Sequence, residues 1–148
     1  MQPRTPIAWL SLSLAVVCAA ALSRHAAAAG ATVWDKVYTA EQAKRGEEVY
    51  AKQCTSCHKD DLLGDNDYSQ PLIGPQFLGK WNNKTVGDLY ERTRTTMPAN
   101  EPDTLKPQEY VDVVSYLLNV NSFPAGQTEL PADLARLKLI ALLEARPK

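Results

Sequence analysis

The sequence has few of the side chains that bind soft metal ions, with three cysteines, two histidines and two methionines in 148 residues. It also lacks an excess of positive charge, because its formal net charge is −1. A nucleic-acid-binding protein needs a basic face to neutralise phosphates, so this balance argues against a nucleic acid as partner. No segment alternates apolar and polar residues with the two-residue period of a strand, and the expected fold class is therefore all-α.

The first 31 residues differ in composition from the rest. Arg4 supplies a short positive region, residues 7–22 are almost uniformly apolar, and small residues follow to Ala31. This order is typical of a secretory signal peptide, cleaved here after Ala29 or Ala31. The apolar run is short for a membrane span. We expect a periplasmic protein whose mature form has no membrane span; the alternative is a chain anchored by an uncleaved leader.

Removing the leader simplifies the inventory of reactive side chains. Cys18, His25 and Met1 all belong to it. We expect residues 32–148 to form a single domain of a size that supports one core. That domain retains only four such residues, namely Cys54, Cys57, His58 and Met97.

Two helices are predicted with clear boundaries. Thr39-Ala-Glu-Gln42 reads as a capping box that opens a helix to about Gln53. Pro107 suits the first position of an amphipathic helix to about Val120, whose apolar residues recur at intervals of three and four. Gly46 lies inside the first helix at a cost of about 1 kcal/mol, which usually marks a close crossing by another element.

The remaining segments give weaker patterns. Residues 59–83 are expected to be a loop, because glycine and proline recur along them. A short helix is expected over 85–93, a second loop over 94–105, and a last helical segment over 131–143.

The stretch Cys54-Thr-Ser-Cys57-His58 admits several interpretations. A structural zinc needs four ligands, and no further Cys or His remains. A redox-active pair would open a helix next to strands, but here a helix precedes the motif. A disulfide across so short a loop would constrain little. Covalent haem uses all three residues, with both thiols forming thioethers and His58 binding the iron. We favour this interpretation because the motif and the export signal both point to it.

Met97 is the candidate for the second axial position on the iron. His58 is the only histidine outside the leader, so a second histidine ligand is excluded there. Met97 is the only thioether, and Pro98 biases it towards an extended backbone. The alternative is that Met97 only fills the core, as methionine often does.

With these residues in place, the chain resembles class I cytochromes c from Thr39 to about Val120. The resemblance implies three core helices plus short helices around one covalently bound haem, a haem-binding core over about 39–120 and a C-terminal extension over 121–148. It further implies that Gly46 and Tyr50 meet Tyr116 and Leu117. It rests on Gly46-x-x-x-Tyr50, Cys54-x-x-Cys57-His58, Leu72-x-Gly74, Thr96-Met97-Pro98 and the helix Tyr110–Leu118.

The chain departs from the family at one place. The family commonly has a proline four residues before the glycine of the Leu72-x-Gly74 step, and its carbonyl accepts a hydrogen bond from the proximal histidine. Gln70 stands there, and the proline comes one residue later at Pro71. Some backbone acceptor is still expected to orient the ring of His58.

Three further side chains are candidates for contacts with haem propionates. The indole N–H of Trp81 and the guanidinium groups of Arg92 and Arg94 could each donate to a carboxylate, since carboxylates buried beside haem need donors. The alternative is a core tryptophan with two solvated arginines.

The function implied by the resemblance is one-electron transfer between redox partner proteins, from a dehydrogenase donor to an oxidase or another cytochrome. Residues 77–97 look like cytochromes that accompany pyrroloquinoline-quinone or molybdenum dehydrogenases of the bacterial periplasm. We expect no enzymatic activity, because no spare His or Cys is left as a catalytic group. The alternatives are a tightly bound subunit of a periplasmic dehydrogenase and a five-coordinate haem sensor or peroxidase-like protein.

Overall fold

The computed structural model describes residues 30–65 and 68–148. The expected leader, residues 1–31, lies outside the described residues except for its last two, and its cleavage stays a prediction. The elements along the chain are η1 (Val33–Asp35), α1 (Ala40–Gln53), α2 (Thr55–His58), α3 (Gly74–Trp81), β1 (Lys84–Thr85), α4 (Val86–Thr96), α5 (Pro107–Val120), α6 (Leu134–Leu137) and β2 (Ala141–Leu142). The fold is mostly helical, which confirms the expected all-α class.

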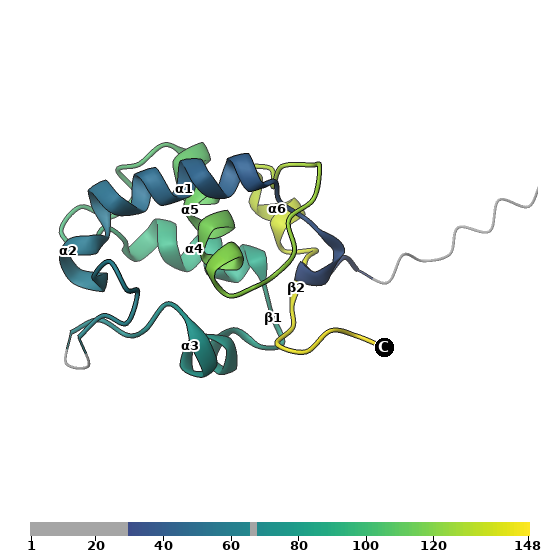
Figure 1. Cartoon of the computed structure of the whole chain (residues 1–148). Helices are drawn as coiled ribbons and strands as arrows, with labels where there is room; N and C mark the ends of the chain where they lie inside the picture. Colours follow the sequence, from purple (N-terminus) through teal and green to yellow (C-terminus); the bar gives the residue numbers. More distant parts are fainter. Residues whose placement is uncertain (1–29, 66–67) are drawn as a thin grey trace, which may run out of the picture.

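The two longest helices, α1 and α5, pack against each other and organise the core (Figure 1). They approach each other tightly at Gly46, where an added Cβ would lie 1.9 Å from the carbonyl oxygen of Asp112 and 2.9 Å from Cβ of Tyr116. One turn further on, the rings of Tyr50 and Tyr116 lie 5.3 Å apart between centroids. The predicted crossing at Gly46 is confirmed, and the backbone that it touches is that of Asp112.

The start of α1 is capped differently from the prediction. The side chain of Thr39 accepts a hydrogen bond from the backbone N–H of Gln42 at 3.1 Å, as a cap should. The side chain of Gln42 does not return the bond. It is fully buried, donates to the carbonyl of Leu130 at 3.0 Å and accepts from the N–H of Leu130 at 2.8 Å. The reciprocal half of the capping box is therefore wrong, because Gln42 instead binds the C-terminal extension.

A helix occupies part of the segment predicted as a loop over 59–83. Helix α3 begins at Gly74 and has Pro75 in its first turn, where proline fits without losing a needed hydrogen bond. Phe77 and Trp81 lie four residues apart, and both are buried on its inner side. The prediction failed because Gly74-Pro75 was taken as a break, although it is a helix start.

The last segment was also mispredicted as helical over 131–143. Only Leu134–Leu137 forms a helix, α6, after which β2 pairs antiparallel with β1 in the register Lys84 to Leu142 and Thr85 to Ala141. The N–H of Val86 donates to the carbonyl of Ile140 at 2.9 Å. The spacing of leucines along this segment suits a helix, but pairing with β1 decides the structure.

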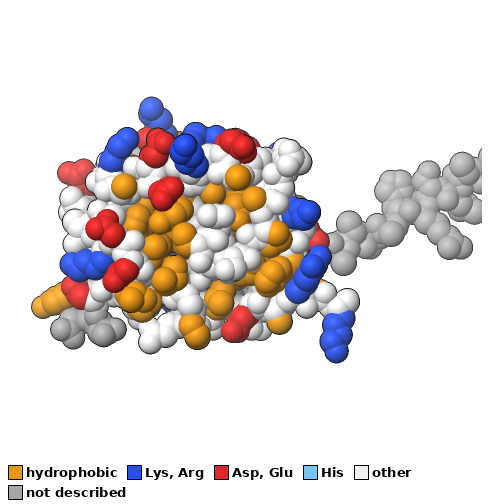
Figure 2. Space-filling model, viewed as in Figure 1, with side chains coloured by type: hydrophobic (Ala, Val, Ile, Leu, Met, Phe, Trp, Pro, Cys, Tyr) orange, Lys and Arg blue, Asp and Glu red, His pale blue; other side chains and the backbone are white. Residues whose placement is uncertain are grey.

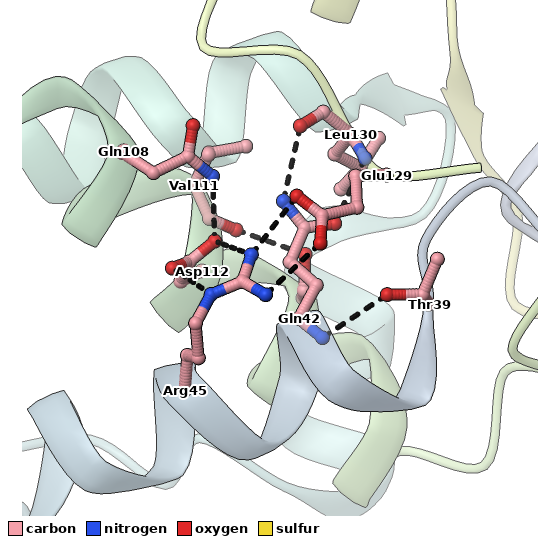
Figure 3. Close-up of polar contacts among 9 residues, drawn as sticks. Thr39, Gln42, Arg45, Gln108, Val111, Asp112, Glu129 and Leu130 are labelled. Carbon is pink, nitrogen blue, oxygen red and sulfur yellow. Dashed lines mark hydrogen bonds and ion pairs between the residues drawn. The ribbon is translucent and has the colours of Figure 1, made fainter.

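A polar network fastens the C-terminal extension to the α1–α5 pair (Figure 3). Arg45 pairs with the buried Asp112 at 3.0 Å and with Glu129 at 2.9 Å. Gln108 donates to Asp112 at 2.7 Å, so the buried carboxylate has several donors. The extension over 121–148 is thus integral to the packing of the haem-binding core implied by the sequence.

Among the residues that the structure describes, no helix is long and apolar enough to cross a membrane.

Candidate functional site

The Cys-x-x-Cys-His stretch forms a single helical turn at the end of α1. Cys54 ends α1 and caps α2, and the N–H groups of Cys57 and His58 both donate to its carbonyl, at 3.2 and 2.8 Å. Residues three and four apart share one face of a helix. The turn therefore presents all three reactive side chains on the same side.

Two hydroxyl groups hold this turn in place. The buried Tyr50 donates its phenol proton to the carbonyl of Lys59 at 2.7 Å, just beyond α2. Ser69 donates to the carbonyl of Cys57 at 2.7 Å and accepts from the N–H of Asp65 at 3.0 Å. The turn is fixed from both α1 and the following loop.

The two thiols are not joined to each other in a disulfide, and Cys54 is half-buried while Cys57 is exposed. Burial raises the pKa of Cys54 to about 11, and the neighbouring Cys57 adds to the shift. At neutral pH the Cys54 sulfur is therefore a neutral thiol.

His58 carries a buried ring nitrogen. Burial lowers its pKa, and the backbone of Gln70 acts in the opposite direction, so the neutral imidazole that binds metals is favoured. Nδ1 is buried and makes no hydrogen bond of acceptable geometry with any described residue. The backbone of Gln70 is nevertheless the acceptor that acts on this ring, and it stands at the position that the resemblance indicated.

Cys54, Cys57, His58 and Met97 all line one cavity of about 590 Å³. Such a volume is usual for cofactor sites, roughly 300–1,000 Å³. Its walls come from the end of α1, from α2, from the loop 68–72, from α3, from α4 and from α5, so nearly every helix contributes. A smaller cavity of about 310 Å³ adjoins it and shares Gln70, Pro71 and Lys80.

Met97 reaches the cavity from the end of α4. It is the C-cap residue of that helix and has an extended backbone, φ −130° and ψ 149°, as Pro98 predicted. Its side chain is half-buried. The structure therefore brings the one thioether outside the leader to the same cavity as His58, although the two residues are 39 positions apart in the sequence.

The three candidates for propionate contacts differ in their position relative to the cavity. Trp81 and Arg92 line the cavity, and their contact with a propionate stays a prediction. Arg94 does not line it. Its guanidinium pairs with Asp103 at 2.6 Å, and its contact with a propionate also stays a prediction. Lys80, which the sequence reasoning missed, is the other cavity-lining cation and also contacts Gln70 at 2.7 Å.

Asn121 is a second residue that sequence reasoning missed. At the C-cap of α5, its amide nitrogen donates to the carbonyls of Leu72 and Leu117 at 2.9 and 2.8 Å, and its oxygen accepts from the N–H of Gly74 at 3.0 Å. It ties the loop that carries Gln70 and Leu72 to the core. No local pattern marks such a long-range clamp.

Hydrophobic side chains gather in the middle of the face seen in Figure 2, between α1 above and α3 below, with charged side chains at its margin.

No group of three or more His, Cys, Asp or Glu side chains within residues 30–65 and 68–148 could hold a metal ion.

Residues 41–117, just over half of the chain, match the family described as cytochrome c oxidase, cbb3-type, subunit III. The chain belongs to this family. It is accordingly a c-type cytochrome, with a haem-based role in electron transfer and redox proteins as partners. No curated protein and no solved structure matches the chain.

The family implies a covalently bound haem c, and the residues of this cytochrome fit it. Two unpaired thiols lie on one helical turn with a histidine whose neutral, metal-binding imidazole is favoured by burial. All three residues line a cavity of cofactor size whose walls are mainly apolar. The match spans both α2 and Met97, and thus covers both sides of the cavity.

Proposed function

We propose that this cytochrome is an exported, periplasmic carrier of single electrons with one haem c, held by Cys54 and Cys57 and bound axially by His58 and Met97. It would accept electrons from a dehydrogenase and pass them to a respiratory acceptor. The observation that carries the proposal is the convergence of these four side chains on one cavity. A bound haem iron supplies the change of oxidation state.

The protein's own contribution is to hold its ligands still. Tyr50 and Ser69 fix the turn that bears His58, and α4 fixes the residue that bears the thioether. Apolar residues from α3, α4 and α5, including Phe77, Leu89 and Leu117, exclude water from the cavity. Methionine opposite histidine raises a haem's reduction potential. We assign no catalytic residue, because electron transfer needs no acid, base or nucleophile.

Replacing Met97 tests the ligand assignment. Both Met97→Ala and Met97→Leu should lose the methionine–iron charge-transfer absorbance and acquire a lower reduction potential, because neither side chain offers a sulfur. Leucine is the sharper variant, since it nearly conserves the volume of methionine. Visible spectra and a redox titration measure both effects. A Met97→Leu protein with the wild-type spectrum and potential would show that Met97 only packs.

Carbon monoxide separates the carrier from a five-coordinate sensor or peroxidase-like protein. With both axial positions filled by protein, the reduced wild-type cytochrome should bind carbon monoxide slowly and incompletely at neutral pH. Met97→Leu should bind it rapidly and in one-to-one amount. Rapid stoichiometric binding by the wild type would contradict the carrier proposal.

The family description favours a second candidate, a cytochrome held as a subunit of a larger respiratory enzyme. A diffusing carrier forms small and short-lived contacts, whereas a subunit buries a large interface. Purification from cells under mild conditions distinguishes them: a carrier elutes at the size of a free chain, and a subunit elutes with its enzyme.

A further inference from the structure

The hydroxyl group of Tyr110 lies where the loop carrying Met97 closes on itself. Tyr110 is in the first turn of α5 and is 1% exposed. Its hydroxyl donates to the carbonyl of Met97 at 2.9 Å and accepts a longer bond from the N–H of Leu105 at 3.4 Å. One buried hydroxyl thus bridges the two ends of the segment between α4 and α5.

This contact completes the anchoring of the Met97 backbone. The N–H of Met97 donates to the carbonyl of Thr93 at 2.9 Å, which ties it to α4. Its carbonyl is tied to α5 through Tyr110. With both backbone polar groups held, only rotations of the side chain remain to place the sulfur.

The neighbours of Tyr110 restrict the ring as well. The rings of Tyr90 and Tyr110 meet edge to face, with centroids 6.4 Å apart and planes at 86°. Both rings are buried, so the hydroxyl has little freedom to leave the Met97 carbonyl. The loop itself is braced further along, where the N–H of Asp103 donates to the carbonyl of Arg94 at 3.0 Å.

We propose that Tyr110 is a positioning residue that holds Met97 at the iron and so resists its displacement by external ligands. The proposal rests on the proposed function, because it takes Met97 as an axial ligand. Tyr110 acts through the Met97 backbone and does not touch the iron. A purely structural tyrosine would contribute to folding but leave ligand exchange unchanged.

Imidazole binding to the ferric holoprotein tests this role, because imidazole nitrogen must replace the methionine sulfur with no change of oxidation state. In Tyr110→Phe, apparent imidazole affinity should rise about fivefold, the factor that a typical net hydrogen bond represents. The matched control is Tyr38→Phe. Tyr38 is fully buried and donates to the carbonyl of Phe123 at 2.6 Å, but it does not line the cavity.

The two variants should melt at similarly lowered temperatures, and only Tyr110→Phe should bind imidazole more tightly than wild type. Equal imidazole affinities in the two variants would overturn the role of Tyr110. Met97→Leu separates this outcome from failure of the ligand assignment. If Met97→Leu also binds imidazole like wild type, Met97 is not the ligand; if it binds far more tightly, only the inference about Tyr110 fails.

Discussion

Changing both Cys54 and Cys57 to alanine is expected to abolish covalent haem attachment completely. Each thioether forms when a thiol S–H adds across a vinyl group, with the proton going to carbon and no net oxidation. Without sulfur at either position, no such bond can form, although His58 remains. The measurement is haem retention after denaturation and acidic organic extraction. Wild type should keep its haem with the chain, and the double variant should release all of it.

Single variants and a neighbouring substitution sharpen this test. Cys54→Ala and Cys57→Ala should each keep one thioether. The visible band of the reduced pyridine complex should then lie between its position for haem with two thioethers and its position for haem with none. Ser56→Ala is the matched control, because Ser56 is exposed on the same turn and should leave attachment unchanged. Haem that survives extraction in the double variant would place the attachment elsewhere.

Replacing Gly46 by alanine is expected to cost about 2 kcal/mol or more of folding free energy on balance. The new Cβ would lie 1.9 Å from the backbone carbonyl oxygen of Asp112, which cannot rotate away, so α1 and α5 must separate. Overpacking a core costs about 1–3 kcal/mol, occasionally more. This loss exceeds the roughly 1 kcal/mol gained when alanine replaces glycine inside a helix. Thermal or denaturant unfolding followed by circular dichroism measures the difference.

Gly79→Ala is the control that isolates the crossing. Gly79 also lies inside a helix, α3, but no atom lies within 4 Å of an added Cβ. There the helix propensity acts alone, and alanine should be neutral or stabilising by up to about 1 kcal/mol. Similar unfolding midpoints for the two alanine variants would mean that the crossing at Gly46 tolerates a side chain.

The parts of the fold that could be predicted are those whose signals are local. Thr39 and Pro107 mark helix starts by their own chemistry, and the apolar spacing of α5 appears within its own residues. The site ligands are equally local, because Cys54, Cys57 and His58 need only one helical turn to come together. Gly46 could be recognised because a costly residue inside a helix needs a reason.

The parts that could not be predicted depend on distant partners. Gln42 fits a capping box by sequence, yet its side chain binds Leu130 across the fold. The C-terminal leucines suit a helix, but β2 forms because β1 offers it a partner. In each case a tertiary contact overrides a valid local preference.

The residues that support the ligands were hidden for the same reason. Tyr110 follows the three- and four-residue spacing of apolar positions in α5, and nothing in that pattern indicates a hydroxyl bond to Met97, 13 residues away. Asn121 gives no signal except a polar residue after a helix, although it clamps Leu72 and Gly74. Residues that bind the cofactor can be predicted from local motifs, whereas the residues that position them depend on distant contacts and cannot.

The central claim is that this cytochrome carries one electron on one covalently held haem. A spectroscopic redox titration of the purified holoprotein, with haem and protein both quantified in the same sample, tests it most directly. We predict one haem per chain and a single reversible transition with the slope of a one-electron couple. More than one haem per chain, several transitions, or a haem that cannot be reversibly reduced and oxidised would contradict it.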